Sequence, residues 1–341
     1  MVDVSVVINA YKRRNFIKEA IISTVLQNVP KDRYEVILVT DINDSELDDL
    51  VAPYGHVIHY SNEKGGAMYA KGIAETSGKV VAFLDDDDMF IQGKLKRVLE
   101  AYESSNSLGL YRHNVTFVNE KGEPLIAPDT QTTTLRQRLI KPVASFAVSY
   151  SQLGRLVVKI GPARRLLKDT VAVLPSHIYT KNLEVEVKMF TREEKEKVIR
   201  YLAEAVHKLR PDLYDPLYWL GFNSSSMTAL REPLLSYLDD ISRFYYAQDN
   251  AYVLIFLASD YGIVHEPLKL TLYRVHGHQI MFRHGNDTAF IKKACNEYFK
   301  LRRLVEELKL GGLIDIDKTE AGGVRQSCEE PQPSPFLISH R

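Results

Sequence analysis

The sequence predicts an α/β protein whose mostly parallel sheet is covered by helices on both faces. In the first quarter of the chain, short apolar runs alternate with segments whose apolar residues recur at helical spacing, and polar turns separate them. The apolar runs have no polar face, which is typical of parallel strands buried between two layers of helices. At 341 residues the chain is long enough to bury a large core.

The expected elements follow one another in a regular order. Strands are expected at 4–8, 34–41, 56–60 and 80–84, and helices at 16–25, 44–50 and 67–76. Farther along, a strand is expected within 110–126, a capping box at Thr191–Glu194 before a helix that ends near 209, and a last helix at 287–310.

Composition argues against several classes of protein. Lys plus Arg equals Asp plus Glu at 44 each, so no net field draws the chain to nucleic acid. The two cysteines, Cys295 and Cys328, lie far apart and form no metal-binding or disulfide pattern, which predicts a reducing compartment. The first expected strand starts close to Met1, and no apolar run is long enough to span a bilayer. These features predict a soluble cytoplasmic protein without a nucleic-acid partner.

A run of carboxylates follows the fourth expected strand. The apolar "VVAFL" at 80–84 leads directly into Asp85–Asp88. Two carboxylates roughly 5 Å apart repel by about 3 kcal/mol at an effective dielectric of about 20, so a folded chain places such a run at a solvated edge or beside a cation. Ligands bind beyond the carboxyl ends of parallel strands. One rim is therefore expected to carry the acids together with Asn9–Arg14, Thr40–Asp44 and Ser61–Gly66.

The acids suit a divalent metal ion. Side chains alternate along an extended segment, so Asp85 and Asp87 are expected to point one way and Asp86 and Asp88 the other. A D-x-D pair of hard oxygen ligands suits Mg²⁺ or Mn²⁺, which also binds substrate phosphates. The alternative is a solvated acidic turn before a helix near Ile91, because aspartates favour helix N-termini. The position on the rim favours the metal.

The N-terminal segments resemble a known family. "VSVVINAYKRRNFIKEAIISTVLQ", "YEVILVTD" and "GIAETSGKVVAFLDDDDMF" are similar to the nucleotide-sugar half of glycosyltransferase family 2, which has the Rossmann-like GT-A fold. The resemblance implies that Asp85 and Asp87 hold Mn²⁺ or Mg²⁺ on the donor diphosphate. It also implies that Asp41 contacts the nucleobase and that Tyr11 and Arg13 line its pocket; for Tyr11 an ordinary turn aromatic is the alternative.

A second block returns to the family pattern. "FYYAQDNAYVLIFLASDYGIVHEPLKLTLYRVHGHQI" at 244–280 is similar to the acceptor-side half, in which an aspartate opens a helix. Asp249 matches the acid that deprotonates the acceptor hydroxyl, with a helix cap as the alternative. Arg274 and His276 match a basic pair that closes over the donor phosphates, with a plain strand-end residue as the alternative for His276. The two blocks together imply a donor-binding set of Asn9, Tyr11, Arg13, Asp41, Gly65, Asp85, Asp86, Arg274 and His276.

Seven positions depart from the family pattern: Asn9, Lys12, Thr40, Ile42, Tyr69, Ala70 and Gln248. The function expected from the resemblance is a metal-dependent glycosyltransferase that moves a sugar from a nucleoside diphosphate to an acceptor hydroxyl with inversion. The departures permit a catalytically silent sugar-nucleotide binding protein as an alternative. A phosphatase of the haloacid dehalogenase type is another, but its acidic motif ends the first strand and is followed by Thr or Val. Here the motif ends the fourth strand and Met89 follows.

The resemblance predicts one GT-A domain over residues 1–290. Its nucleotide-sugar half is expected at 1–100 and its acceptor-side half at 217–285. Residues 127–216 are expected to form a largely helical insertion, 287–310 a C-terminal helix, and 311–341 an irregular tail.

The expected insertion contains a basic segment at 135–170. It carries eight basic residues against one acid, Asp169, with apolar residues interleaved. Such a segment suits an anionic membrane surface or a lipid-linked acceptor; an amphipathic insertion packed on the core is the alternative. The expected partners are a nucleoside-diphosphate sugar, a saccharide or lipid-linked acceptor, and peripherally the inner face of a membrane.

Overall fold

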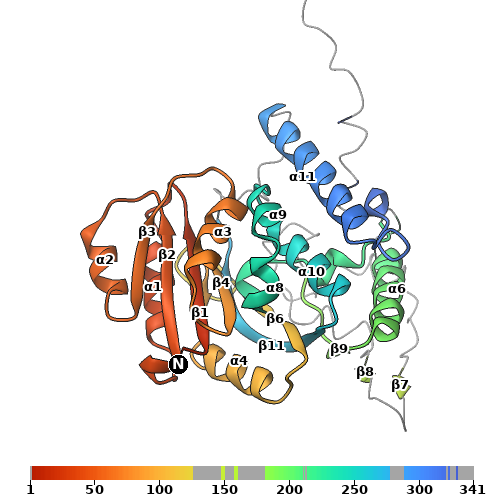
Figure 1. The fold of residues 1–341 in the computed structure, drawn as a ribbon, viewed down its shortest axis with the longest axis horizontal. Coiled ribbons are helices and arrows are strands. Elements are labelled where there is room, and N and C mark those ends of the chain that lie inside the picture. The colour runs from red at the N-terminus through yellow and green to blue at the C-terminus, as the bar shows by residue number, and fades with distance from the viewer. Residues whose placement is uncertain are drawn as a thin grey trace, which may run out of the picture.

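A single large sheet, curled and covered by helices, organises the chain in the computed structural model (Figure 1). The structure describes residues 2–125, 181–209, 211, 213–276, 288–319, 322 and 328, with the backbone of two short paired strands at 147–149 and 157–159. Within these residues the sheet order is β3-β2-β1-β4-β10-β6-β11-β5, and β9 pairs with β11.

The N-terminal half supplies one end of the sheet and its nearest helices. Its elements are β1 (Val4–Ala10), α1 (Ile17–Val25), β2 (Tyr34–Thr40), α2 (Ser45–Val51), β3 (Gly55–His59), α3 (Gly65–Glu75), β4 (Val80–Asp85), β5 (Met89–Phe90) and α4 (Lys94–Glu103). The pairs β1–β2, β1–β4 and β2–β3 are all parallel. The apolar residues of β1, β2 and β4 are buried on both faces, as the apolar runs predicted, whereas those of the edge strand β3 are only partly buried.

The second half of the chain completes the sheet. Its main elements are β6 (Leu108–Val118), β9 (Val187–Met189), α6 (Arg192–Leu209), α7 (Leu217–Leu220), β10 (Met227–Leu230), α8 (Arg231–Leu235), α9 (Leu238–Ser242), α10 (Gln248–Ala258), β11 (Gly262–Arg274) and α11 (Thr288–Glu307). β6 and β11 form a long parallel pair, whereas β10 runs antiparallel between β4 and β6. The long pairs are therefore parallel and the short ones antiparallel, which confirms the predicted α/β fold.

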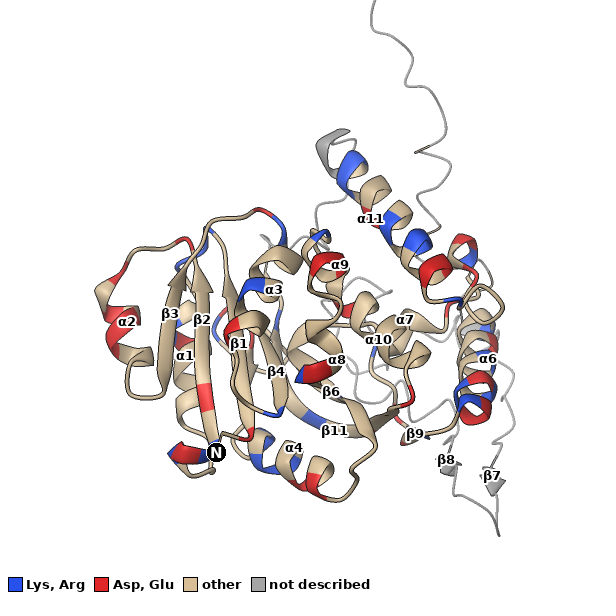
Figure 2. Cartoon of the chain, in the orientation of Figure 1, with Lys and Arg blue, Asp and Glu red and all other residues tan. Residues whose placement is uncertain are grey.

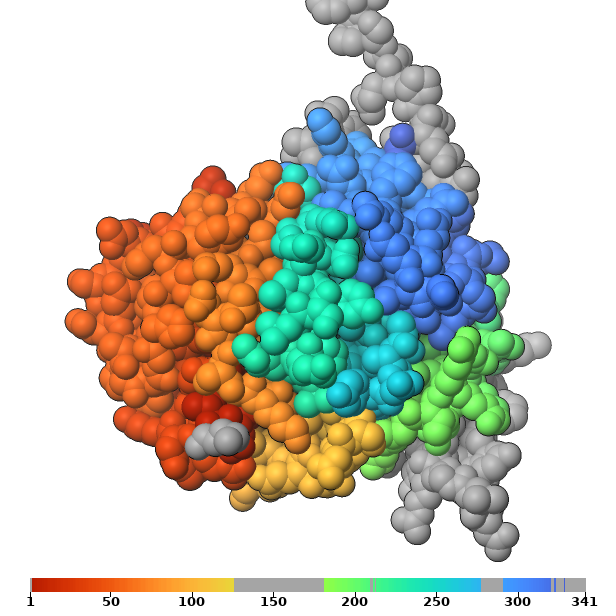
Figure 3. Space-filling view, in the orientation of Figure 1, coloured from red at the N-terminus to blue at the C-terminus, as the bar shows by residue number. Residues whose placement is uncertain are grey.

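The two halves pack through a shared aromatic core. The ring of Phe83 on β4 stacks on that of Tyr252 on α10, with ring centroids 4.3 Å apart, and both side chains are fully buried. In the space-filling view the orange N-terminal segments and the teal segments around α8–α10 meet in continuous contact, and the blue C-terminal helix lies against the teal ones (Figure 3). This packing fixes α10 against the strand that carries the acids.

Most of the expected elements are confirmed, with ends shifted by one to three residues. The capping box before α6 is present: Thr191 Oγ1 accepts from the Glu194 backbone N–H at 3.2 Å, and Glu194 Oε2 accepts from that of Thr191 at 3.0 Å. In the expected insertion the structure describes α6 and β9, while most of 127–180 lies outside the described residues, including nearly all of the basic segment. The expected domain limits stay predictions.

The first part of the expected irregular tail packs against the rest of the protein. Ile314 and Ile316 are buried, and the backbone N–H of Tyr214 donates to Lys318 O at 2.9 Å. These two side chains belong to a short segment of turns and one 3-10 helix (Ile316–Lys318). Such a segment has no long hydrophobic pattern, so the sequence did not indicate that it packs on the protein. The remainder lies largely outside the described residues.

The two cysteines are also paired, contrary to the sequence-based expectation. Cys295 on α11 and Cys328 form a disulfide across 33 residues of sequence. One pair at this separation has no spacing signature, because the fold alone brings the later residue back onto α11. The two cysteines therefore do not indicate a reducing compartment.

Charges of both signs are interspersed over the helices, as on α6 and α11 in Figure 2. On α6 they pair at helical spacing, for example Lys197 with Glu193, whose Nζ and Oε1 are 2.5 Å apart. Within the described residues, no helix has the length and apolar character needed to cross a bilayer.

Candidate functional site

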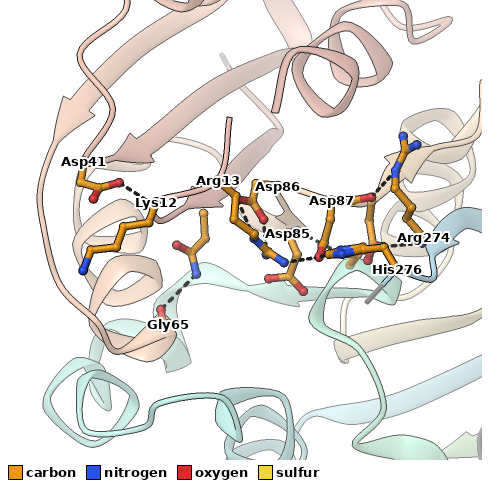
Figure 4. Close-up of polar contacts among 12 residues, drawn as sticks. Lys12, Arg13, Asp41, Gly65, Asp85, Asp86, Asp87, Arg274 and His276 are labelled. Atoms are coloured by element: carbon orange, nitrogen blue, oxygen red, sulfur yellow. Dashed lines mark hydrogen bonds and ion pairs between the residues drawn. The ribbon is translucent and has the colours of Figure 1, made fainter. Parts of the chain in front are cut away.

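The carboxyl ends of β1, β2 and β4 gather the predicted donor-side residues on one rim (Figure 4). The parallel register places Asn9 beside Asp85 and Ala10 beside Thr40. The turn after β1, which carries Tyr11–Arg13, therefore lies between the acids after β4 and Asp41 after β2. The predicted rim is confirmed, although Tyr11 contacts only the ammonium of Lys12, 4.8 Å from its ring centroid, and the apolar core in the described structure.

The four acids do not alternate as the sequence pattern suggested. β4 ends at Asp85, and the chain then turns, with the backbone N–H of Asp88 donating to Asp85 O at 3.1 Å. Alternation requires an extended backbone, which stops at the strand end. As a result Asp86 and Asp87 both reach the same guanidinium, that of Arg13.

Arg13 and His276 neutralise part of the acid run. Arg13 Nη1 donates to Asp87 Oδ2 at 2.5 Å, while its Nε and Nη2 donate to the two oxygens of Asp86. His276 Nε2 lies 3.0 Å from the same Asp87 oxygen. Arg13 thus joins the turn after β1 to the acids, and His276 joins them to the chain after β11.

Arg274 binds the turn that carries Asp87 and Asp88 through its backbone and its side chain. Its backbone N–H donates to Asp88 Oδ1 at 3.0 Å, and its Nε donates to Asp87 O at 3.0 Å. The guanidinium is fully buried, stacks on the Phe16 ring at 4.3 Å and pairs with Glu19. The side chain therefore braces the turn, and its expected contact with the donor phosphates stays a prediction.

Burial gives the acids an unusual electrostatic state. Burial raises the pKa of Asp85 to about 6, and the charge of Asp87 adds to the rise. Burial also raises the pKa of Asp86 and of Asp88 well above the usual range. Asp87 is the exception, because the His276 hydrogen bond and the Arg13 charge outweigh burial and lower its pKa. A cation bound at the rim would stabilise the charged forms of these carboxylates and lower the repulsion between them.

The carboxylates of Asp85 and Asp87 have the chemistry of a Mg²⁺ or Mn²⁺ site. Asp85 Oδ1 accepts from Tyr69 Oη at 2.9 Å, and Asp87 contacts Arg13 and His276 through Oδ2, so hydrogen bonds orient both carboxylates. Within the described residues no three His, Cys, Asp or Glu side chains are grouped to hold a metal. The donor set fits such an ion when ligand phosphates supply the remaining oxygens.

Asp41, Asn9 and Gly65 are the remaining residues of the predicted donor-binding set. Asp41 Oδ1 accepts from the backbone N–H of Lys12 at 2.8 Å. Lys12 has a positive φ of 59°, a conformation that non-glycine residues seldom adopt, and the Asp41 bond holds the turn in it. Gly65, the first residue of α3, accepts at its carbonyl from Asn9 Nδ2 at 3.4 Å.

Asp249 lies in the first turn of α10, facing the same region. The helix starts at Gln248 and its N-cap is Ala247, so Asp249 is inside the helix and the capping alternative is wrong. Its Oδ2 accepts from the backbone N–H of Asn223 at 3.1 Å and its Oδ1 from that of Asn250 at 2.9 Å. Burial raises the pKa of Asp249 to about 7, and the Asp85 charge acts in the same direction. A carboxyl tuned to this range suits proton transfer near neutral pH.

Asn223 connects the acid run to Asp249, and no pattern in the sequence indicates this role. Its backbone N–H donates to Asp249, while its side-chain Nδ2 donates to Asp88 Oδ2 at 3.1 Å. It adopts a positive φ of 65°. The same residue therefore contacts both sets of carboxylates, in a backbone conformation that only its surroundings maintain.

A buried lysine supports the same loop. Lys94 Nζ donates to Ser225 O at 2.6 Å, and Ser225 Oγ accepts from the backbone N–H of Asp85 at 2.9 Å. Burial lowers the pKa of Lys94 well below its usual value. A lysine in the helix after an acidic run looks like an exposed charge in sequence, which is why pattern reasoning passed over it.

Glu297 on α11 holds the start of the helix that carries Asp249. Its buried carboxylate accepts from the backbone N–H groups of Tyr245, Tyr246 and Ala247 at 2.9–3.1 Å. In the same segment, Tyr245 O accepts from the backbone N–H of Gly65 at 3.0 Å. The C-terminal helix is thus bonded to a segment that joins α3 to α10, a link across fifty residues of sequence without a local signal.

Comparisons with known proteins agree with this arrangement. Residues 5–157 match the family model described as Glycosyl transferase family 2. The match places the sequence of this N-terminal part of the chain with the domains of glycosyltransferase family 2. The family's expected α/β sheet, with the acidic run after its fourth strand, is the one observed.

Individual relatives match about a third of the chain. The chain is 31% identical over 126 residues to an uncharacterized glycosyltransferase of Rickettsia felis, covering 35% of this chain and 20% of the relative. It is 34% identical over 104 residues to the putative teichuronic acid biosynthesis glycosyltransferase TuaG of Bacillus subtilis, covering 28% of this chain and 40% of that protein. The matched stretches therefore span a fifth to two fifths of these two relatives.

Among solved structures, TarS (residues 1–349) of S. aureus is similar at 14% identity and a TM-score of 0.46, covering 90% of this chain and 65% of that one. TarS has also been solved in complex with UDP-GlcNAc.

The raised pKa of Asp249 predicts that the free energy of unfolding decreases as the pH rises. The folded protein binds a proton at this site between about pH 4 and 7, where the unfolded chain does not, so the free energy of unfolding falls as pH rises through that window. Asp249→Asn removes this titration. We expect its Tm, relative to wild type, to be higher at pH 8 than at pH 5 in thermal melts. Parallel pH dependence of the two Tm values would contradict the shift.

Proposed function

We propose that the protein is an inverting glycosyltransferase that moves a sugar from a nucleoside diphosphate to an acceptor hydroxyl. One observation carries the proposal. A buried run of acids on the rim lies near Asp249 of α10, a carboxyl whose pKa is raised to about 7. The match to the family 2 model supports the reaction class. The base, the sugar and the acceptor are open to experiment.

In the proposed reaction the rim binds the donor. Asp41, Tyr11 and Arg13 would bind the nucleobase, because the turn that carries Tyr11 and Arg13 lies between Asp41 and the acids. Arg13 and His276, which now bind Asp87, carry donors suited to phosphate oxygens. The diphosphate would therefore lie along the acids, with its anomeric carbon toward α10.

A divalent ion on Asp85 and Asp87 would offset the charge that develops on the leaving diphosphate. Asp87 suits this role because its pKa is lowered and its carboxylate stays ionised. Tyr69 and Ser225 hold Asp85 by hydrogen bonds to its carboxylate and its backbone N–H. These bonds keep one carboxylate oxygen oriented before any ligand arrives.

Asp249 would accept the acceptor proton. The acceptor oxygen attacks the anomeric carbon as its proton moves to Asp249, the bond to the diphosphate breaks, and the leaving group keeps the electron pair. One such displacement inverts the anomeric centre. Backbone N–H donors from Asn223 and Asn250 orient the carboxylate in the required direction.

We also propose a cytoplasmic enzyme that contacts the inner face of a membrane through the basic segment 135–170, most of which lies outside the described residues. The segment's eight basic residues support this proposal, and a lipid-linked acceptor would be brought to the site by it. The Cys295–Cys328 disulfide weighs against a reducing compartment.

The metal proposal predicts that donor binding depends on a divalent ion. Calorimetry with UDP-, GDP- and dTDP-sugars should show binding that EDTA weakens and Mn²⁺ or Mg²⁺ restores. Asp87→Ala should abolish that dependence, because one of the two proposed ligands is gone. Sugar transfer by wild-type protein that persists in EDTA would exclude the metal.

The base proposal predicts a split between binding and transfer. Asp249→Asn should leave donor and metal affinity nearly unchanged, because a general base acts on the acceptor. Single-turnover transfer should fall by about 10²–10⁴-fold, the usual contribution of general acid–base catalysis. The acid limb of the wild-type pH profile near pH 7 should vanish in the variant. Near-normal transfer by Asp249→Asn places the base elsewhere.

The membrane proposal predicts salt-sensitive flotation. Liposomes containing anionic lipid should retain the protein at low salt and release it at high salt, since each basic residue near an anionic surface contributes about 1 kcal/mol and is screened by salt. Liposomes of neutral lipid provide the control. Equal retention by both would favour a segment packed on the core.

A further inference from the structure

The Cys295–Cys328 disulfide closes a loop that holds most of α11. The two Cα atoms are 5.6 Å apart, although 33 residues of sequence separate the cysteines. We call residues 295–328 the disulfide loop, of which the structure describes 295–319, 322 and 328. Both cysteines are half-buried, so neither residue is enclosed in the apolar core. The bond is therefore placed where a small thiol can reach it.

The turn of α11 that carries Cys295 also carries Glu297. Side chains two residues apart on an α-helix point about 200° apart, and therefore to nearly opposite sides. Glu297 is 2% exposed and accepts from the backbone N–H groups of Tyr245–Ala247 at 2.9–3.1 Å. The disulfide is thus attached to one side of a helical turn whose other side is bonded to the start of α10 (Figure 1).

Other contacts hold the disulfide loop in place beside the covalent bond. Ile316 is buried, and Tyr298 Oη donates to Asp317 Oδ1 at 2.5 Å. The backbone N–H of Tyr214 donates to Lys318 O at 2.9 Å. A disulfide stabilises mainly by limiting the freedom of the opened chain. Its reduction is therefore expected to leave the folded arrangement unchanged and to raise the population in which α11 opens.

Opening of α11 would disturb the helix that carries Asp249. Without Glu297, three backbone N–H donors ahead of α10 lose their acceptor, and a buried donor without a partner is costly. That segment would move toward solvent to regain partners, and it is continuous with the first turn of α10. Asp249 lies in this turn, held by N–H donors from Asn223 and Asn250. Order in α11 therefore contributes to the order of Asp249.

Reduction of the bond is a balanced thiol–disulfide exchange. A thiolate of a dithiol reductant attacks one cysteine sulfur, the other sulfur leaves as a thiolate and takes a proton, and the second thiol of the reductant then resolves the mixed disulfide. The protein gains two electrons and two protons and ends with two thiols, while the reductant ends as a disulfide. Disulfides of cytosolic proteins are usually transient and catalytic or redox-sensing. A reversible bond is therefore compatible with the cytoplasmic location proposed above.

We propose that the Cys295–Cys328 disulfide is a redox switch for sugar transfer. When the bond is formed, it holds α11 against the start of α10 and keeps Asp249 in place. When the bond is reduced, α11 opens more often and transfer slows. The effect on transfer rests on the proposed function, whereas the effect on the start of α10 does not.

Hydrogen–deuterium exchange tests the coupling between the two helices. The full chain is compared with and without dithiothreitol, and mass spectrometry of an alkylated sample shows that reduction is complete. Exchange at the amides of Tyr245–Ala247 should become at least about 10-fold faster on reduction, a part of the roughly 30-fold or more by which a disulfide commonly shifts the folding equilibrium. Single-turnover transfer should slow in parallel and recover after reoxidation with oxidised glutathione.

Two variants separate the bond from other effects of the reductant. Cys328→Ser removes the bond, so it should exchange as fast as reduced wild type and show no response to dithiothreitol. Asn296→Ala is the matched control, because it changes an exposed residue between Cys295 and Glu297 and leaves both cysteines in place. It should respond to dithiothreitol as wild type does. Thermal melts establish that each variant is folded.

Exchange at Tyr245–Ala247 that stays the same in fully reduced protein overturns the switch. A response confined to the disulfide loop also overturns it, because the bond would then act on α11 without reaching α10. Unchanged transfer by fully reduced protein overturns the regulatory role as well. If exchange responds but neither redox state transfers a sugar, the proposed function fails while the coupling of the two helices is supported.

Discussion

Charge neutralisation at the end of β4 is the constraint on which the rest of the structure depends. Four consecutive carboxylates are largely buried there, and isolated buried charges are costly enough to unfold a domain. Arg13 from the turn after β1 and His276 from the chain after β11 bind Asp87 together. Segments more than 180 residues apart in sequence are held at one rim because the acids need partners from both. The shape of the site follows from this electrostatic requirement.

Much of the fold was predictable because, in the N-terminal half, the local hydrophobic pattern of each segment agrees with the strand or helix that it forms. Apolar runs without a polar face are typical of strands in a covered parallel sheet, and parallel strands bring their carboxyl ends to one edge. The positions of Asn9, Arg13, Asp41 and Asp85 on the rim follow from those rules alone. The order of β10, β6 and β11 does not, since an antiparallel strand inserted between two parallel groups leaves no pattern in the sequence.

What the sequence could not reveal depends on contacts between distant segments. The acids were expected to alternate, but the chain turns immediately after Asp85, and no residue type in an all-aspartate run marks that turn. Asn223 donates its own backbone N–H to Asp249, and Glu297 accepts from backbone N–H groups of another segment. Such roles depend on where a backbone donor lies in space, which neither periodicity nor a family motif encodes. The disulfide was missed for the same reason.

The bonds from Glu297 to Tyr245–Ala247 have a consequence for how this chain can change over evolutionary time. A terminal helix is usually free to be lost, lengthened or exchanged between relatives. Here such an exchange would leave three backbone donors ahead of α10 without their carboxylate acceptor, unless the incoming helix carried an acid at the same place. The helices α11 and α10 are therefore expected to be inherited as a unit.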